Sequence, residues 1–178
     1  MIEENVKNKV LLIDPLKCDG CRECEKACAQ KHTGNRKIGL KRIQIMGTGD
    51  GTFFVPSTCR QCVEPPCMSV CPKGAISRDV QLERVVIDTK LCVGCAMCVS
   101  ACPSGSMTFA HDLGLSYKCD LCDGDPQCVQ VCEKNAIRYV ESNRLHHNRV
   151  RESARAMLGG RARPKERILQ AIKEEERL

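Results

Sequence analysis

The sixteen cysteines of this 178-residue chain fall into four groups of four. In each group the first three cysteines lie close together, and the fourth follows the third after three residues. The groups are Cys18, Cys21, Cys24 and Cys28; Cys59, Cys62, Cys67 and Cys71; Cys92, Cys95, Cys98 and Cys102; and Cys119, Cys122, Cys128 and Cys132. No cysteine lies outside these groups. The spacing therefore predicts that the thiols act in sets, around which the rest of the chain must fold.

Three closely spaced cysteines can bind three corners of one iron–sulfur cubane, because the short loop passes from one corner to the next. In bacterial two-cluster ferredoxins the fourth cysteine of such a run ligates the other cluster. Four runs supply sixteen thiolates, which suffice for four 4Fe–4S clusters. The spacing thus predicts a protein that transfers single electrons.

Other uses of cysteine fit this pattern less well. A disulfide scaffold belongs to secreted proteins, but residues 1–10 are polar and charged and do not resemble a signal peptide. Structural zinc takes four thiolates, usually from two CxxC pairs across a longer gap. A radical-SAM site needs CxxxCxxC, and its third position holds Lys31, Gly74, Gly105 or Asn135 instead.

The chain has few apolar residues other than cysteine. Hydrophobic residues make up 42% of the chain, but sixteen of them are cysteines, and there is no tryptophan. Such a chain cannot stabilise itself by side-chain burial alone, so the clusters must serve as the core. We therefore expect the cluster-free protein to be largely unfolded, because metal binding supplies the folding free energy.

Two sequence patterns occur twice. Residues 12–21 recur as residues 86–95, each predicted to be a β-strand that leads into a cysteine loop with a glycine of positive φ, Gly20 or Gly94. Residues 73–76 likewise recur as 134–137, each leading from a cysteine loop to a strand. The Cys-x3-Cys ends predict single helical turns, the first at residues 25–29.

Charged residues gather in two places. The linker 29–58 predicts a hairpin with strands at 41–46 and 52–55, and its basic residues are interpreted as a solvated face: Lys31, Arg36, Lys37, Lys41 and Arg42. One histidine there, His32, is weak support for a ligand. Three acidic residues, Asp120, Asp123 and Asp125, are expected to lower the potential of a nearby cluster; the alternative is that residues 123–126 simply form a turn.

The order of these motifs resembles the four-cluster iron–sulfur subunit family of molybdenum and tungsten pterin enzymes. The resemblance covers residues 9–141 and lies in residues 59–76, 92–103 and 118–122, including Pro72 and Pro103 after the inner runs. Related subunits serve carbon monoxide dehydrogenases and hydrogenases. The short gap at 123–127 is most similar to the partners of carbon monoxide dehydrogenases and of tungsten aldehyde ferredoxin oxidoreductases, including the benzoyl-CoA reductase complex.

This resemblance implies an α+β fold of two nested ferredoxin-like modules, each of the bacterial 2×[4Fe–4S] type. The outer module comprises 9–28 and 111–141, the hairpin linker 29–58, the inner module 59–110, and a basic helical tail 142–178. The family's pairing implies four ligand sets: Cys18, Cys21, Cys24 and Cys132; Cys119, Cys122, Cys128 and Cys28; Cys59, Cys62, Cys67 and Cys102; and Cys92, Cys95, Cys98 and Cys71.

Two classes of function remain open for such a chain. It is either an electron-transfer subunit between a catalytic pterin enzyme and another redox partner, or a freely diffusing polyferredoxin; a zinc-stapled interaction protein is a third, weaker alternative. The basic tail indicates docking on an acidic protein partner in a hetero-oligomer. It has no aromatic residues that could stack on bases, so nucleic-acid binding is not favoured. We identify no catalytic residues and no membrane span, and we expect a cytoplasmic location.

Overall fold

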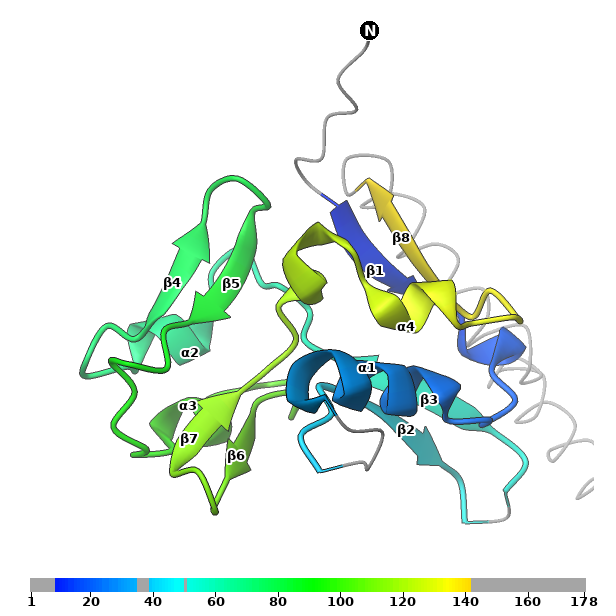
Figure 1. The fold of residues 1–178 in the computed structure, drawn as a ribbon, viewed down its shortest axis with the longest axis horizontal. Helices are drawn as coiled ribbons and strands as arrows, with labels where there is room; N and C mark the ends of the chain where they lie inside the picture. Colours follow the sequence, from blue (N-terminus) through cyan, green and yellow to red (C-terminus); the bar gives the residue numbers. More distant parts are fainter. Residues whose placement is uncertain (1–8, 35–38, 50, 142–178) are drawn as a thin grey trace, which may run out of the picture. The chain divides into compact units, whose positions relative to one another are not determined.

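The computed structural model describes residues 9–34, 39–49 and 51–141 (Figure 1). This part of the chain has a mixed α/β fold, and its residues up to Val140 belong to one unit. The predicted basic tail at 142–178, with the helices expected there, lies outside the described residues. The strands are β1 (Lys9–Ile13), β2 (Ile43–Gly47), β3 (Phe54–Thr58), β4 (Ile76–Asp79), β5 (Arg84–Ile87), β6 (Thr108–Ala110), β7 (Leu115–Tyr117) and β8 (Ile137–Glu141). The helices are η1 (Pro15–Lys17), α1 (Glu23–Thr33), α2 (Pro66–Ser69), α3 (Met97–Ser100), η2 (Leu121–Gly124) and α4 (Gln127–Gln130).

The described strands form four two-stranded sheets (Figure 1). Three of these sheets, β2–β3, β4–β5 and β6–β7, are antiparallel pairs of consecutive strands. The fourth joins β1 to β8, which lie at opposite ends of the described chain. Segments more than a hundred residues apart are thereby brought side by side.

The repeated sequence patterns form equivalent structures. The amide of Asp14, after β1, donates to the carbonyl of Ala136, before β8, at 2.8 Å. In the same way Asp88, after β5, donates to Ala75, before β4, at 2.8 Å. The predicted strand-to-loop and loop-to-strand segments are therefore confirmed, and β1–β8 corresponds to β5–β4.

Helix α1 differs from the single turn predicted at residues 25–29, because it runs for 11 residues. A proline follows the last cysteine of the second and third runs, whereas Ala29 follows Cys28 and allows the helix to continue. The helix ends at Gly34, whose φ of 68° is left-handed and whose amide donates to the Gln30 carbonyl at 3.0 Å. The other three α-helices are single turns.

The linker hairpin is present, with its strands a few residues later than predicted. Strands β2 and β3 pair from Ile43 opposite Thr58 to Gly47 opposite Phe54. Ile43 and Ile45 alternate with exposed residues and are buried, as expected for a strand with one face on the core. The hairpin thus supplies apolar cover for a region rich in cysteine.

The buried residues form two separate groups. The first draws on β1, α1, β2, β8 and the fourth cysteine run, and contains Cys24, Cys28, Cys119 and Cys128 among its members. The second comprises Cys67, Ile76, Val85, Cys98 and Met107. Thiols therefore occupy positions that aliphatic side chains fill in most domains.

Candidate metal centres

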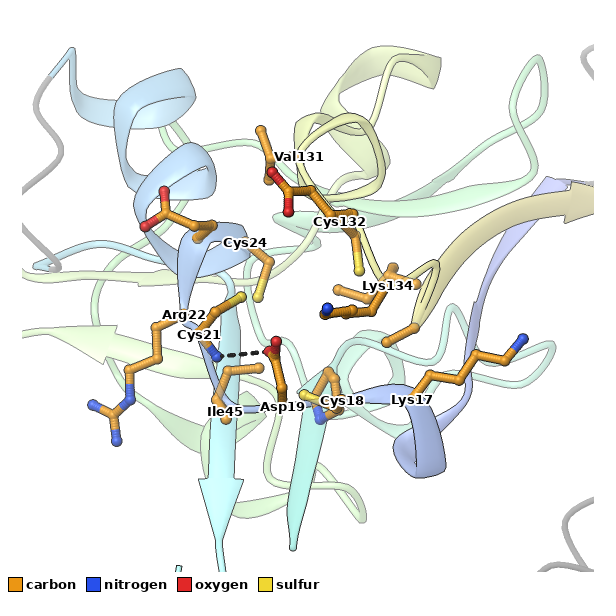
Figure 2. A pocket seen from close by; sticks show the side chains of 15 residues that line it. Lys17, Cys18, Asp19, Cys21, Arg22, Cys24, Ile45, Val131, Cys132 and Lys134 are labelled. Carbon is orange, nitrogen blue, oxygen red and sulfur yellow. Dashed lines mark hydrogen bonds between the residues drawn. The ribbon is translucent and has the colours of Figure 1, made fainter.

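Four cysteine sulfurs line one cavity between the loop after β1 and the loop after α4. Cys18, Cys21 and Cys24 come from the first run, whereas Cys132 ends the fourth run. Figure 2 shows their side chains directed toward the same space. The pairing of β1 with β8 positions these two loops, because Cys18 follows β1 and Cys132 precedes β8.

Two further cavities each have four cysteines in their walls. One is lined by Cys59, Cys62 and Cys67 of the second run and by Cys102 of the third. The other is lined by Cys92, Cys95 and Cys98 of the third run and by Cys71 of the second. In both, three thiols come from one run and the fourth comes from another.

The four remaining cysteines, Cys28, Cys119, Cys122 and Cys128, are all buried. Three of them belong to the same core group, and Cys122 acts electrostatically on Cys128 together with Cys119 and Cys28. These four thiols therefore also lie close together. All sixteen cysteines fall within the described ranges, and none forms a disulfide there.

Several of the thiols are held in surroundings that disfavour the charged form. Burial raises the pKa of the Cys24 thiol to about 12. Burial also raises the pKa of Cys128, and the nearby Cys119 and Cys122 add to the effect. Such thiols become thiolates only beside positive charge, which a bound metal provides. The donor set and its surroundings therefore fit an iron–sulfur group.

Two thiols have the opposite tendency. Burial acts to raise the pKa of Cys71 and Cys102, but hydrogen-bond donors outweigh it and lower the pKa of both. The donors are the backbone amides of residues 73–76 for Cys71, and the Ser104 hydroxyl with the amides of Ser104, Ser106 and Met107 for Cys102. Donors of this kind also tune the potential of a cluster bound by these sulfurs.

Two buried hydroxyls support the same conclusion. Ser116 Oγ and Tyr139 Oη have no hydrogen-bond partner within the described part of the chain. Ser116 lines the cavity of Cys92, and Tyr139 packs against the core group that contains Cys119. A buried hydroxyl without an acceptor is costly, and the sulfurs of a bound cluster are acceptors that the protein atoms do not provide.

The cysteine loops depend on left-handed backbone. The first and third runs place Arg22 and Ala96 at φ of 61° and 57°, each directly after the second cysteine. The fourth run has three consecutive residues of this kind, Leu121, Cys122 and Asp123. Left-handed geometry costs about 1–2 kcal/mol per non-glycine residue. Such conformations persist where the surrounding structure requires them, which is typical of ligand sites.

Two basic residues of the linker do not lie on the solvated face that the sequence suggested, whereas Lys31 is exposed as expected. Lys41 Nζ lies 3.1 Å from the carboxylate of Glu25, which is 1% exposed. The Arg42 guanidinium pairs with Asp120, and its backbone amide donates to Cys28 Sγ at 3.2 Å. That interpretation was wrong for these two residues, because each neutralises an acidic side chain far away in sequence; Arg36 and Lys37 lie outside the described residues.

His32 lies beside the fourth run. Its Nε2 is 3.7 Å from Cys122 Sγ and 3.6 Å from Asp120 Oδ1. Burial lowers the pKa of His32, and the charge of Arg42 acts in the same direction. A neutral imidazole at this place can direct one N–H group at the Cys122 sulfur.

The three acidic residues of the fourth run are balanced by neighbours. Asp120 pairs with Arg42, and Asp123 lies 2.7 Å from Arg84 Nη2. Asp125 accepts hydrogen bonds from the side-chain amides of two glutamines. Two arginines thus offset part of the negative charge at the fourth run, and the effect of these residues on a cluster potential stays a prediction.

Comparison with known proteins assigns this chain to a family whose match covers the second, third and fourth cysteine runs. Residues 51–142 match the family described as "4Fe-4S dicluster domain". The chain belongs to this family. No helix in the described ranges is long and apolar enough to cross a membrane.

Relatives of this dicluster protein include redox proteins of several organisms. The beta subunit of NADH-dependent phenylglyoxylate dehydrogenase of Aromatoleum evansii is 38% identical over 77% of this chain, which spans only 31% of that longer protein. The polyferredoxin-like subunit of aliphatic sulfonate oxidoreductase of Pyrococcus furiosus is 36% identical, over 80% of this chain and 84% of its own length. The electron transport protein HydN of Escherichia coli K12 is 34% identical, over 85% of this chain and 98% of its own.

Among solved structures, the active site complex BamBC of benzoyl coenzyme A reductase aligns over 93% of this chain and 96% of the matched chain, with a TM-score of 0.41 and 24% identity. The family and the named relatives make this chain a 4Fe–4S iron–sulfur protein that transfers electrons.

Proposed function

We propose that this chain carries single electrons through four 4Fe–4S clusters, between a catalytic oxidoreductase subunit and a second redox partner. The observation that carries the proposal is the composition of the three cavities. Each is lined by three cysteines of one run and one cysteine of another, which is the ligand arrangement of two-cluster ferredoxins.

In the proposed arrangement the clusters form two nested modules, with the ligand sets implied by the resemblance. Cys18, Cys21, Cys24 and Cys132 hold one outer cluster, and Cys28, Cys119, Cys122 and Cys128 hold the other. The inner clusters take Cys59, Cys62, Cys67 and Cys102, and Cys71, Cys92, Cys95 and Cys98. The β1–β8 pairing and the separation of the buried residues into two groups support this nesting.

The protein's part in this function is to hold the ligands and control their surroundings. Backbone amides and the Ser104 hydroxyl donate to sulfur, while buried thiols and aliphatic side chains exclude water. When bound, each cluster accepts and releases one electron. Cys21 and Cys95 are exposed, so one cluster of each module reaches the surface, where electrons can pass to another protein.

The proposed catalytic partner is a molybdenum or tungsten pterin enzyme. Relatives that are named as subunits of a phenylglyoxylate dehydrogenase and an aliphatic sulfonate oxidoreductase support a catalytic oxidoreductase as the partner. Its pterin type is proposed from the resemblance of the short gap at 123–127. A catalytic centre that reacts in two-electron steps must pass its electrons one at a time to one-electron carriers. Several clusters in series provide such a path.

Metal analysis of the anaerobically purified chain tests the proposal. We expect about sixteen iron and sixteen sulfide per chain, the content of four 4Fe–4S clusters, and interacting signals by EPR after reduction. Roughly half that content, or zinc in place of iron, contradicts the four-cluster assignment.

A freely diffusing carrier is the second candidate function. The relative HydN is named an electron transport protein and is matched over 98% of its length. Gel filtration of native extract separates the two candidates. Elution in a persistent large complex supports the subunit, whereas elution near the 19.8 kDa of the chain supports the carrier.

A further inference from the structure

One lysine is buried close to two of the cysteine sets. Lys118, which follows β7 and precedes Cys119, is 4% exposed. Within the described part of the chain its ammonium has no carboxylate at ion-pair distance. A buried charge without a partner costs several kcal/mol, so something other than a side-chain carboxylate must compensate it.

The contacts of Lys118 Nζ define its charge. It donates to the backbone carbonyls of Val85 and Cys119, the latter at 2.8 Å, and lies 3.5 Å from Gln61 Oε1. All three partners are acceptors. A lysine ammonium offers three N–H donors and no acceptor, which matches this set of three acceptors.

Gln61 holds this arrangement in place. Its Oε1 accepts from the amide of Val85 at 2.8 Å, and its Nε2 donates to the carbonyl of Cys119 at 2.8 Å. Gln61 is itself buried and sits at a left-handed φ of 50°. The amide oxygen next to Lys118 is therefore fixed on both sides, and the ammonium has little freedom to move.

Two cysteine sets lie close to this ammonium. Lys118 lines the cavity of Cys59, Cys62, Cys67 and Cys102. It also precedes Cys119, and Cys59 packs against the core group that contains Cys119. Burial raises the pKa of Cys67, and the positive charge of Lys118 is the strongest influence opposing it.

We infer that Lys118 is a built-in counter-charge for the clusters of these two sets, and that it raises the reduction potential of both. Each added electron makes a cluster more negative, and a fixed cation in a buried, poorly screened place favours that change. The cation thereby makes the junction between the inner and outer modules a preferred place for an electron. This inference rests on the proposed ligand sets.

Replacement of Lys118 by methionine in the full chain tests the inference. After iron and sulfide analysis, EPR-monitored redox titration resolves the potentials of the four clusters. In Lys118→Met we expect lower potentials for the clusters of Cys59 and of Cys119, with those of Cys18 and Cys92 unchanged. Lys118→Arg should keep the wild-type potentials, because the charge remains.

Two further variants separate charge from structure. Gln61→Glu places a carboxylate beside the ammonium while Lys118 stays in place, and should lower the same two potentials. Lys90→Met removes an exposed lysine two residues before Cys92 and should change none of the four, since solvent screens that charge.

Three outcomes of these measurements would overturn the inference. Unchanged potentials in both Lys118→Met and Gln61→Glu overturn the inference, as does an equal shift of all four clusters. Loss of iron from both variants overturns the inference too, because Lys118 then has only a structural role, as a donor that links backbone carbonyls. A wild-type chain with half the expected iron contradicts the proposed function itself, whatever these variants show.

Discussion

Gly94 lies where the loop before Cys95 passes closest to another backbone segment. Its φ is 70°, and a Cβ at this position would collide with the carbonyl oxygen of Gly114. Backbone atoms cannot rotate away as a long side chain can. Gly94 is therefore required both by its own conformation and by its neighbour.

The substitution Gly94→Ala should reduce occupancy of the cluster proposed at Cys92, Cys95 and Cys98, because the loop must shift to relieve the collision. Gly105→Ala is the matched control: its φ is 60°, but nothing lies within 4 Å of an added Cβ. It should cost only about 1 kcal/mol and keep full iron. Equal iron content in the two variants would contradict the argument.

Cys28 lies one helical turn beyond Cys24 on α1, yet the two belong to different proposed sets. Cys28→Ser should therefore perturb the cluster of Cys119, Cys122 and Cys128, whereas Cys24→Ser should perturb the cluster of Cys18. EPR and Mössbauer spectra of the two variants distinguish the sites. Damage confined to the Cys18 cluster in Cys28→Ser would show that the nested pairing is wrong.

At the scale of elements, α1 is attached to the linker hairpin by a buried acid. Glu25 Oε1 accepts from the amide of Ile45 at 2.8 Å and lies 3.1 Å from Lys41 Nζ. Its other oxygen has no hydrogen-bond partner among the described residues. Lys41 is thus the compensating charge for a carboxylate that lies almost entirely out of water.

Lys41→Met should loosen the hairpin from α1, since it leaves that carboxylate without its cation. The expected loss is about 3 kcal/mol, at the low end for a broken buried pair. Lys26→Met is the control, because the side chains of Lys26 and its partner Glu23 are 39% and 41% exposed, and pairs open to solvent contribute about 0–1 kcal/mol. Urea-induced loss of cluster absorbance measures both; similar midpoints would contradict a structural role for Lys41.

Secondary-structure elements that depend on a short stretch of sequence were predictable. Contacts between residues far apart in the sequence were not. The strands before Cys18 and Cys92, their glycines and the hairpin follow from repeats and alternation that are visible locally. Arg42 and Asp120 are 78 residues apart and Gln61 and Cys119 are 58 apart, so no periodicity indicates their contact. Lys118 was part of a recognised motif, but its burial depends on the packing of both halves.

At the scale of the whole molecule, thiols form a large part of the described core, four of the nine buried residues in the larger group. Cys24, Cys28, Cys119 and Cys128 are central members of the larger buried group. Without metal their sulfurs make only weak contacts, and the few aliphatic residues cannot offset the entropy of folding the chain.

Removal of iron should therefore unfold the chain. We expect chelation under anaerobic conditions to abolish the far-UV circular dichroism of strands and helices together with the cluster absorbance. Reconstitution with iron and sulfide, as the control, should restore both. A cooperative thermal transition in the metal-free chain would contradict this expectation.

The pairing of β1 with β8 also determines the order in which the protein can mature on the ribosome. Strands β4 and β5 are near neighbours in the chain, so the central thiols can meet as soon as residues up to 107 have emerged. Strand β1 must wait for β8, and Cys18, Cys21 and Cys24 wait with it for Cys132. The first thiols to be synthesised are thus among the last to be enclosed, and during that interval they are the ones most open to oxygen and to the wrong metal.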